Sequence, residues 1–552
     1  MFTRESMGIQ DARAAVAKVL ASVRKSDGPL AVVIADENGD VVHLLTQDGA
    51  SATDIRNAER KAYTAAFIGR DTWAYRQQIT ADGRTVADWS DPMITTLHGG
   101  VTVRRMGQVV GAIGVAGSGS EDRDEVLAMG AAELLARGAH GTTAREQKAD
   151  AQAAGHAVHG LQTAPPPRTA KGKRRKAYNL PGLAPAGAVA PDLVRVGELF
   201  FTSGVRGVDR ATGKIGATPA EEFALAWENL AALVKGAGLS LDDVGLVTVF
   251  IGSQDYRPYI SPGWLKLFPK KGARPARKTT SFLLPPGEGV QLQAYGVVGH
   301  NRQAIEVKGL THKDPLPNGV RMGDYVFSSV IVPWDLSTSL PVVGEEAQTD
   351  KCFENMRVFM EHAGGGVDDV ALQWVYLNDF AYQPYMVDVY VDTWGIGAFQ
   401  AARKTFRYPM GGQIQIQVIG KVGAPRYNFE IPGHEHHDPI PMAARLGNLF
   451  CSSGVSGVDT SSPDKLEPVE GVSGQSLHGL RNIRALVEAG GGSADDIGHI
   501  TVLVQDYADL EAVDAEWVKM FPDPADRPAR QVMRLGVQRR MRAQFHMIAS
   551  VD

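Results

Sequence analysis

The feature of this sequence that most constrains its fold is a segment that occurs three times after residue 180. VGELFFTSGVRGVD from Val196, MGDYVFSSVIVPWD from Met322 and LGNLFCSSGVSGVD from Leu446 share one pattern of apolar, glycine and serine positions. The glycine that they share recurs at steps of 126 and 124 residues. Such a step is the length of a whole domain, because the units of solenoid proteins span only about 20–50 residues. The sequence therefore predicts three tandem domains of one fold.

Each copy continues in the same order. A helix with a central asparagine follows, then an Asp-Asp turn, a β-rich strand, a second helix, an Ala-Arg dipeptide and a strand with alternating polar positions. The arginines of the dipeptide, Arg277, Arg403 and Arg530, are 126 and 127 residues apart. The order β-β-α-β-α-β predicts an α+β sheet with both helices on one face, and three linked copies can close into a pseudo-threefold ring. We expect the domains at 181–305, 306–428 and 429–552.

Residues 1–140 predict a separate α+β domain. Helical periodicity over 12–20 is followed by a hairpin that turns at Glu37 to Asp40, a helix over 58–67, a second hairpin that turns at 106–108, and a helix over 125–135.

Residues 141–180 read as a linker, because the polar, alanine-rich stretch leads into three consecutive prolines and a basic run. The basic run at 168–176 has two interpretations, a solvated tether or a nucleic-acid patch. We favour the tether, because aromatic residues are not interleaved with the basic ones.

The composition is that of a folded protein that acts on small molecules. With 57 basic and 62 acidic residues the net charge is −5, which argues against a nucleic-acid partner. The two cysteines exclude a disulfide framework and fit a reducing compartment, so we expect a cytoplasmic protein. No window approaches the roughly 18 uncharged apolar residues that a membrane span needs, so we expect no membrane partner.

The three repeats resemble the RidA/YjgF family, which has a chorismate-mutase-like fold. The resemblance rests on G-x-hydrophobic-F-x-S-[SG], the asparagine-bearing helix, the Asp-Asp turn, and Ala-Arg followed by the strand with alternating polar positions. It implies a trimer, here an intrachain pseudo-trimer, with pockets between subunits that hydrolyse reactive enamines and imines and release ammonia. It also implies that Arg277, Arg403 and Arg530 bind a substrate carboxylate, although an alternative is that they only tie domains together.

The repeats depart from the family pattern at the residue that activates water. Gln291, Gln415 and Gln544 stand where the family's deaminases place a glutamate, and an amide orients water but accepts no proton. At a second family position, often asparagine on the second helix, the third repeat has Asp514. We expect the three pockets to differ from one another.

A replacement for the missing base is expected in the segment H-x-D-P-hydrophobic-P that precedes the second and third repeats. It places His312 and Asp314 in one repeat and His436 and Asp438 in the other, where they are candidates for acid-base chemistry. Two alternatives stay open for the cluster around His434 and His436: a divalent metal site, or a polar loop before a strand.

The first 137 residues resemble the GlcG/HbpS family. The resemblance rests on VIADENGDVVHLLTQDGA, AERKAYTAA and GGVTVRRMGQVVGAIGVAGS. Members are associated with haem or corrinoid binding, which implies His98 as an axial ligand and Gly99 and Gly100 as positions where the backbone approaches a ligand. The alternative is a solvated loop histidine. Lys61 is expected on a helix near Asp48.

Together these features predict a catabolic enzyme that cleaves a C–N bond of a small carboxylate-bearing substrate. In this interpretation Arg403 and Arg530 hold the carboxylate, Gln415 and Gln544 orient water, and no cofactor is required. One alternative is a protein that binds or senses haem or another small ligand, with the repeats as a scaffold. Another is a ring-opening hydrolase, hydratase or isomerase that uses the same pockets. A homo-oligomer through the N-terminal domain is compatible with each.

Overall fold

The computed structural model divides the chain into two compact units, residues 1–147 with 379–388, and residues 148–378 with 389–552. The residues that it describes are 6–24, 27–81, 83–105, 108–136, 174–310, 312, 314–394, 400–432, 434, 436, 438–461, 467–534 and 541–552. Among them, no helix combines the length and the apolar character needed to cross a bilayer.

The N-terminal domain is a four-stranded antiparallel sheet with helices, in the strand order β2-β1-β4-β3. The first hairpin turns where the sequence predicts it, because Gly39 adopts a φ of +90° and Asp36 accepts hydrogen bonds from the Asn38 and Asp40 amides. A helix, α3, occupies a segment that the sequence analysis took as loop. The elements are α1 (Ile9–Ala21), β1 (Ala31–Asp36), β2 (Val41–Thr46), α2 (Ala52–Ile68), α3 (Thr72–Ala81), β3 (Gly100–Arg105), β4 (Gln108–Ala116) and α4 (Glu121–Ala136).

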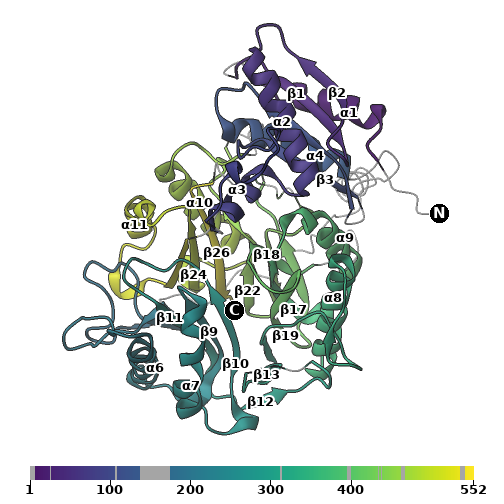
Figure 1. Cartoon of the computed structure of the whole chain (residues 1–552). Helices are drawn as coiled ribbons and strands as arrows, with labels where there is room; N and C mark the ends of the chain where they lie inside the picture. The colour runs from purple at the N-terminus through teal and green to yellow at the C-terminus, as the bar shows by residue number, and fades with distance from the viewer. Residues whose placement is uncertain are drawn as a thin grey trace. The chain divides into compact units, whose positions relative to one another are not determined.

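The second unit contains three sheets of identical topology, which confirms the α+β class. Their strand orders are β10-β9-β11-β7-β6-β5, β18-β17-β19-β14-β13-β12 and β25-β24-β26-β22-β21-β20. In each sheet the edge strand that carries the repeated arginine pairs in parallel with its neighbour, and the other pairs are antiparallel. Figure 1 shows α6 and α7 on one face of the first sheet and α8 on one face of the second.

The three repeats are built from the following elements. The first has β5 (Arg175–Tyr178), β6 (Leu193–Val196), β7 (Leu199–Thr202), β8 (Val205–Arg206), α6 (Pro219–Gly236), β9 (Val244–Ile251), α7 (Ile260–Leu267), β10 (Ala276–Ser281) and β11 (Val290–Val297). The second has β12 (Arg302–Ile305), β13 (Gly319–Met322), β14 (Tyr325–Ser328), β15 (Trp334–Asp335), β16 (Leu340–Pro341), α8 (Glu345–His362), β17 (Val370–Leu377), α9 (Gln383–Trp394), β18 (Ala402–Arg407) and β19 (Ile414–Lys421). The third has β20 (Arg426–Phe429), β21 (Ala443–Leu446), β22 (Leu449–Ser452), β23 (Val455–Ser456), α10 (Val472–Ala489), β24 (Ile497–Val504), α11 (Leu510–Met520), β25 (Ala529–Arg534) and β26 (Ala543–Ser550).

Two details of the predicted topology are wrong. The predicted order gives the Ala-Arg dipeptide no strand of its own, but the repeated arginines lie on a separate edge strand that precedes the last one (β10, β18 and β25). Each sheet also gains a leading strand, which in the first repeat is β5, inside the predicted linker 141–180. The last residues of the basic run, which was predicted to be solvated, therefore belong to the first sheet, and Arg175 is buried. Residues 137–173 lie outside the described part of the chain.

The leading strands tie each repeat to the previous one through an arginine. This arginine donates to the carbonyl of the first residue of the central strand in the preceding repeat. Arg302 Nη1 reaches Val244 O at 2.9 Å, Arg426 Nη2 reaches Val370 O at 2.7 Å, and Arg175 Nη1 reaches Ile497 O at 3.2 Å. The last of these contacts joins the first repeat to the third, so the contacts form a closed cycle.

The asparagine at the centre of each long helix has a structural role. Its side-chain amide donates to two backbone carbonyls of the segment that precedes the helix. Asn229 Nδ2 donates to Arg206 O at 3.0 Å and to Val208 O at 2.8 Å. Asn355 and Asn482 make the equivalent pairs of bonds. The repeated asparagine thus satisfies buried backbone groups, which explains its recurrence without a role in chemistry.

Each sheet has one face against its own helices and one against the other repeats. On β11, Val290, Leu292 and Ala294 belong to the core shared with the helices. Tyr295, two residues along from Gln293, belongs to a core that all three repeats share. Because side chains alternate along a strand, Gln291 and Gln293 also face the other repeats.

Candidate functional site

The repeats meet at three equivalent seams, each marked by one hydrogen bond. The backbone amide of the repeated arginine donates to a serine hydroxyl of the next repeat: Arg277 to Ser329 at 3.0 Å, Arg403 to Ser453 at 2.9 Å and Arg530 to Ser203 at 2.8 Å. We call them the first, second and third seams. These seams are the positions at which the sequence predicts pockets between the domains.

The guanidinium groups at the seams are buried and stacked on aromatic rings. Arg277 lies 4.9 Å above the ring of Trp264, Arg403 lies 4.8 Å above Tyr390, and Arg530 lies 5.2 Å above Trp517. The side chains of Arg277 and Arg403 are each 1% exposed, whereas that of Arg530 is 11% exposed. Burial lowers the pKa of Arg277 to about 10, so the group stays charged at neutral pH.

Each of these arginines already pairs with a carboxylate of the chain. Arg277 Nη2 lies 2.8 Å from Asp314 Oδ2, and Arg403 pairs with Asp438; both aspartates come from the next repeat. Arg530 pairs instead with Asp514, which lies on α11 of the same repeat. The structure therefore brings the predicted aspartates to the predicted arginines, as ion-pair partners.

The predicted histidines lie in the same leading segments. Burial lowers the pKa of His312 to about 4, because the charged ring would lose its hydration. His434 Nε2 lies 3.3 Å from Ser456 O and 3.2 Å from Ser456 Oγ, and its ring centre is 6.0 Å from that of His436. Within the described residues no three metal-ligating side chains gather, while Glu435 and His437 of the predicted cluster lie outside them. The metal site stays a prediction.

The glutamines at the position of the family's glutamate are each bonded to the preceding repeat. Lys278 Nζ donates to Gln415 Oε1 at 2.5 Å, and Lys404 Nζ donates to Gln544 Oε1. In the third seam Gln531 Nε2 donates to Gln291 Oε1 at 2.9 Å. Arginine and glutamine of one seam thus come from different repeats, so Gln544 accompanies Arg403 and Gln415 accompanies Arg277.

Two lysines of the seams, Lys278 and Lys404, were not predicted as site residues. Their position in the sequence could have identified them, because each lysine directly follows the repeated arginine. The third repeat has Gln531 at this position. Adjacent residues of a strand point to opposite faces. Arg277 accordingly contacts Trp264 on the helix side, whereas Lys278 Nζ lies 4.2 Å from the ring centre of Tyr376 in the next repeat. Each seam therefore has an arginine side and an amide side.

The third seam contains a carboxylate, Glu288, that was not predicted from the sequence. Glu288 accepts a hydrogen bond from Gln291 Nε2 at 2.7 Å and pairs with Arg206 Nε at 2.6 Å. Its side chain is 7% exposed. These two contacts hold the Glu288 side chain beside Gln291.

In the N-terminal domain, Lys61 and the two glycines serve packing. Lys61 Nζ pairs with Asp124 at 2.8 Å and donates to Val115 O at 2.8 Å, so its partner is Asp124. A Cβ on Gly99 would lie 2.8 Å from Asp124 Cβ, and one on Gly100 would lie 2.3 Å from Lys61 O. The glycines allow the chain to pass close to α2 and to Asp124.

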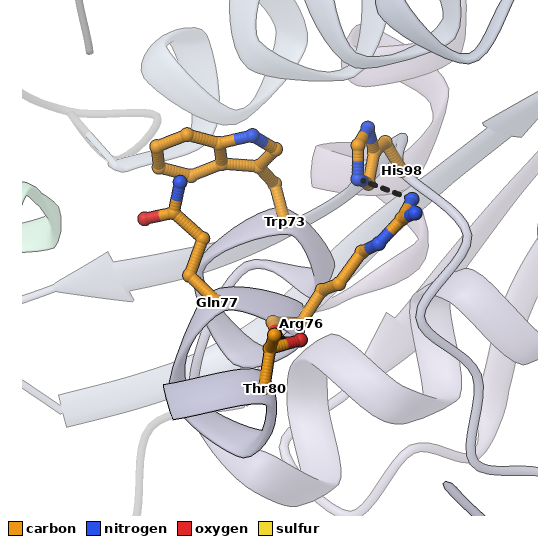
Figure 2. A pocket seen from close by; sticks show the side chains of 5 residues that line it. All are labelled: Trp73, Arg76, Gln77, Thr80 and His98. Carbon is orange, nitrogen blue, oxygen red and sulfur yellow. Dashed lines mark hydrogen bonds between the residues drawn. The ribbon is translucent and has the colours of Figure 1, made fainter. Parts of the chain in front are cut away.

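An open hollow of about 520 Å³ lies beside His98 (Figure 2). Trp73, Arg76, Gln77 and Thr80 line it from one face of α3, because residues spaced three and four apart share a helix face. Arg76 Nη1 lies 3.2 Å from His98 Nε2, and His98 Nδ1 lies 3.5 Å from Glu121 Oε2. Both ring nitrogens of His98 are therefore engaged by protein groups.

Comparison with known proteins separates the same two parts. Residues 7–133 match the family described as haem degrading protein HbpS-like, and residues 183–291 and 440–544 match the family described as endoribonuclease L-PSP. The middle repeat lies outside these ranges but has the same sheet topology as the other two.

Individual relatives cover one domain each. Protein GlcG of Escherichia coli is 33% identical over 115 residues, which are 21% of this chain and 84% of GlcG. The 2-iminobutanoate/2-iminopropanoate deaminase of Salmonella typhimurium is 34% identical over 98 residues, which are 18% of this chain and 74% of that protein. A crystal structure of a double mutant of HbpS from Streptomyces reticuli is 29% identical and covers 24% of this chain and 90% of its own, with a TM-score of 0.23.

Proposed function

Because the chain belongs to the GlcG/HbpS family over its N-terminal domain and to the RidA/YjgF family over its first and third repeats, we propose that it hydrolyses the C–N bond of a small carboxylate-bearing imine or enamine. We assign the reaction to the second seam, between the second and third repeats. The deaminase of Salmonella supports the reaction class, since its name gives 2-imino acids as its substrates.

The observation that carries the proposal is the pair between Arg403 and Asp438. The Arg403 side chain is 1% exposed, while that of Asp438 is 21% exposed, so the carboxylate lies on the solvent side of a buried guanidinium. A guanidinium fork binds carboxylates through charge-assisted hydrogen bonds. A substrate carboxylate that enters from solvent would displace Asp438 and take its place.

Displacement of Asp438 would also release an acid-base group. The free carboxylate would lie beside His436, two residues earlier in the same segment. Both groups are of the kind that moves protons at neutral pH, which a glutamine such as Gln544 does not do.

The test is ammonia release from 2-iminopropanoate, generated continuously in the assay by an amino-acid oxidase and compared with the uncatalysed background. We expect wild type to accelerate release, Arg403→Gln to abolish the acceleration, and Arg403→Lys to retain part of it with a raised KM. Circular dichroism of the variants checks that they are folded. A folded Arg403→Gln protein with the wild-type rate would refute the assignment.

A second candidate function belongs to the hollow beside His98. An arginine and an indole on one helix face suit a small, flat, negatively charged ligand. His98 does not fit as a haem ligand in this arrangement, because Arg76 and Glu121 engage its two nitrogens. Titration with haemin checks this, and we expect His98→Ala to leave the position of any Soret band unchanged.

A further inference from the structure

The second seam contains an amine whose surroundings differ from those of an ordinary lysine. Lys404 Nζ donates to Gln544 Oε1 and lies 5.8 Å from the ring centre of Phe406. In the part of the chain that the structure describes, no carboxylate pairs with it. A buried ammonium without a counter-charge is costly, and accordingly burial lowers the pKa of Lys404 to about 8.

The two seam lysines differ in exposure. Lys278, in the first seam, is 2% exposed, whereas Lys404 is half-buried. The residue that follows the seam serine is also smaller at the second seam. It is Val330 at the first seam and Gly454 at the second. A Cβ on Gly454 would lie 2.8 Å from Cδ of Gln544, so glycine leaves room beside the glutamine that Lys404 contacts.

The third seam has the room but not the amine. Gly204 occupies the position of Gly454, and a Cβ there would lie 2.5 Å from Oε1 of Gln291. The residue that faces this glutamine is Gln531 in place of lysine. Among the seams, the second alone combines a lysine with a glycine.

A buried histidine of the second seam lies next to Gln544 on the same strand. His546 lies two residues after Gln544 on β26, so both side chains share one face of the strand. It is 2% exposed, and within the described residues neither ring nitrogen has a hydrogen-bond partner. Burial and then the charge of Lys404 lower its pKa to about 3, so the ring is neutral and one nitrogen can accept a proton or a hydrogen bond.

We propose that Lys404 Nζ is the nucleophile of the second seam and attacks the C=N carbon of a small 2-imino acid, or the carbonyl carbon of the corresponding 2-oxo acid. This inference rests on the proposed function and deepens it, because it supplies a route to ammonia that needs no glutamate. The substrate carboxylate would stay on Arg403, so the reacting carbon, which is bonded to it, would lie between Arg403 and Lys404, with Gln544 hydrogen-bonded to the lysine.

The reaction balances with water as the one co-reactant. The electron pair of neutral Nζ forms a bond to the carbon of the protonated imine, and the original C–N bond breaks. The released ammonia carries the two hydrogens of the substrate nitrogen and one from Nζ, which leaves a protonated imine between Lys404 and the substrate. Water then adds to the same carbon, the C–Nζ bond breaks, and the 2-oxo acid leaves with lysine as the ammonium, which returns a proton to solvent.

The experiment is reductive trapping on the full chain with pyruvate and cyanoborohydride, read by intact mass and by peptide mapping. We expect one adduct, on Lys404, and none on that site in Lys404→Gln, which reproduces the natural residue of the third seam. Gly454→Val, which reproduces Val330 of the first seam, should lower the yield severalfold while Lys404 is still present. Gln531→Lys should create a second adduct at position 531.

Lys278→Gln is the matched control, because it removes the equivalent lysine from the first seam, where that lysine is almost fully buried. It should leave the adduct on Lys404 unchanged. The yield in wild type should rise with pH, with a midpoint near the pKa of about 8. Adducts scattered over surface lysines, at equal total yield in Lys404→Gln, would overturn the proposal. Gly454→Val keeps the test decisive if Lys404→Gln does not fold.

Ammonia release separates this inference from the proposed function. If wild type and Lys404→Gln release ammonia at the same rate, the lysine is not the nucleophile, although the C–N hydrolase activity stands. If wild type releases no ammonia but forms the adduct on Lys404, the amine is reactive as proposed and the assigned reaction is wrong.

Discussion

Arg175 Nε donates to Asp526 Oδ1 at 2.9 Å, and through this pair the first strand of the first repeat is bonded to the last repeat of the chain. The side chains are 2% and 8% exposed. Arg302 and Arg426 make the corresponding backbone contacts between neighbours along the sequence, so Arg175 is the residue that closes the cycle. The first predictions concern this closure.

We expect Arg175→Ala to lower the free energy of unfolding of the repeats by about 3 kcal/mol, because removal of one partner leaves Asp526 buried without its counter-charge. Urea denaturation followed by far-ultraviolet circular dichroism measures the change. The control is Lys519→Ala, whose ion pair with Glu516 is on the surface and whose side chain is 68% exposed, so its effect should stay within about 0.5 kcal/mol. Equal effects of the two substitutions would contradict the role of Arg175.

Asp438→Asn should destabilise the chain by about 3 kcal/mol in buffer, since the buried Arg403 then loses its ion pair with Asp438. Pyruvate should restore part of this loss, because its carboxylate can bind where Asp438 was. The measurement is the rise in Tm with pyruvate, which should be larger for the variant than for wild type. Asp514→Asn is the control in the third seam, where Arg530 is more exposed, and a Tm rise of the same size there would argue against a specific site at Arg403.

Stability should rise with pH because of Lys278. Burial lowers its pKa from 10.5 to about 7, so between these values the unfolded chain binds a proton that the folded chain does not. Unfolding then becomes less favourable as pH rises across this window, by up to about 1.4 kcal/mol per pH unit. Lys278→Met should remove this part of the slope. Urea denaturation at pH 7, 8 and 9 checks the difference, and parallel slopes for the two proteins would show that Lys278 is charged in the fold.

Gly100→Ala should destabilise the N-terminal domain by about 2 kcal/mol, since its Cβ would lie 2.3 Å from Lys61 O and backbone would have to move. Gly130→Ala, inside α4, meets no atom within 4 Å and should stabilise the domain by about 0.5 kcal/mol. Thermal unfolding of both variants measures the contrast. A tolerated Gly100→Ala would instead favour the predicted ligand-binding role of this glycine.

The repeated arginines and the α+β sheets could be predicted because both leave periodic marks in the sequence. The register of 126 and 127 residues identified Arg277, Arg403 and Arg530 before any contact was known. Gln291 was identified by its match to the family's glutamate position, and the alternation along β11 places it away from the helices.

What each arginine contacts could not be predicted, because its partners belong to another repeat. The sequence did not show which arginine Gln415 accompanies, and the fold places Gln415 on Lys278 at the first seam. The leading strands were missed for a similar reason. Arg175 lies in a short polar segment that resembles a tether, and only its contacts with the third repeat bury it. The helix α3 carries too weak an apolar pattern to stand out from loop.

The covalent link between the three repeats allows each seam to change alone. In a trimer of identical subunits one substitution alters three pockets at once, so a residue harmful at one of them is harmful at all. Here valine, glycine and glycine stand at one position and lysine, lysine and glutamine at another. In such a chain one seam can carry the reaction while the other two stabilise the fold. A titration of reactive amines should therefore find one per polypeptide rather than three.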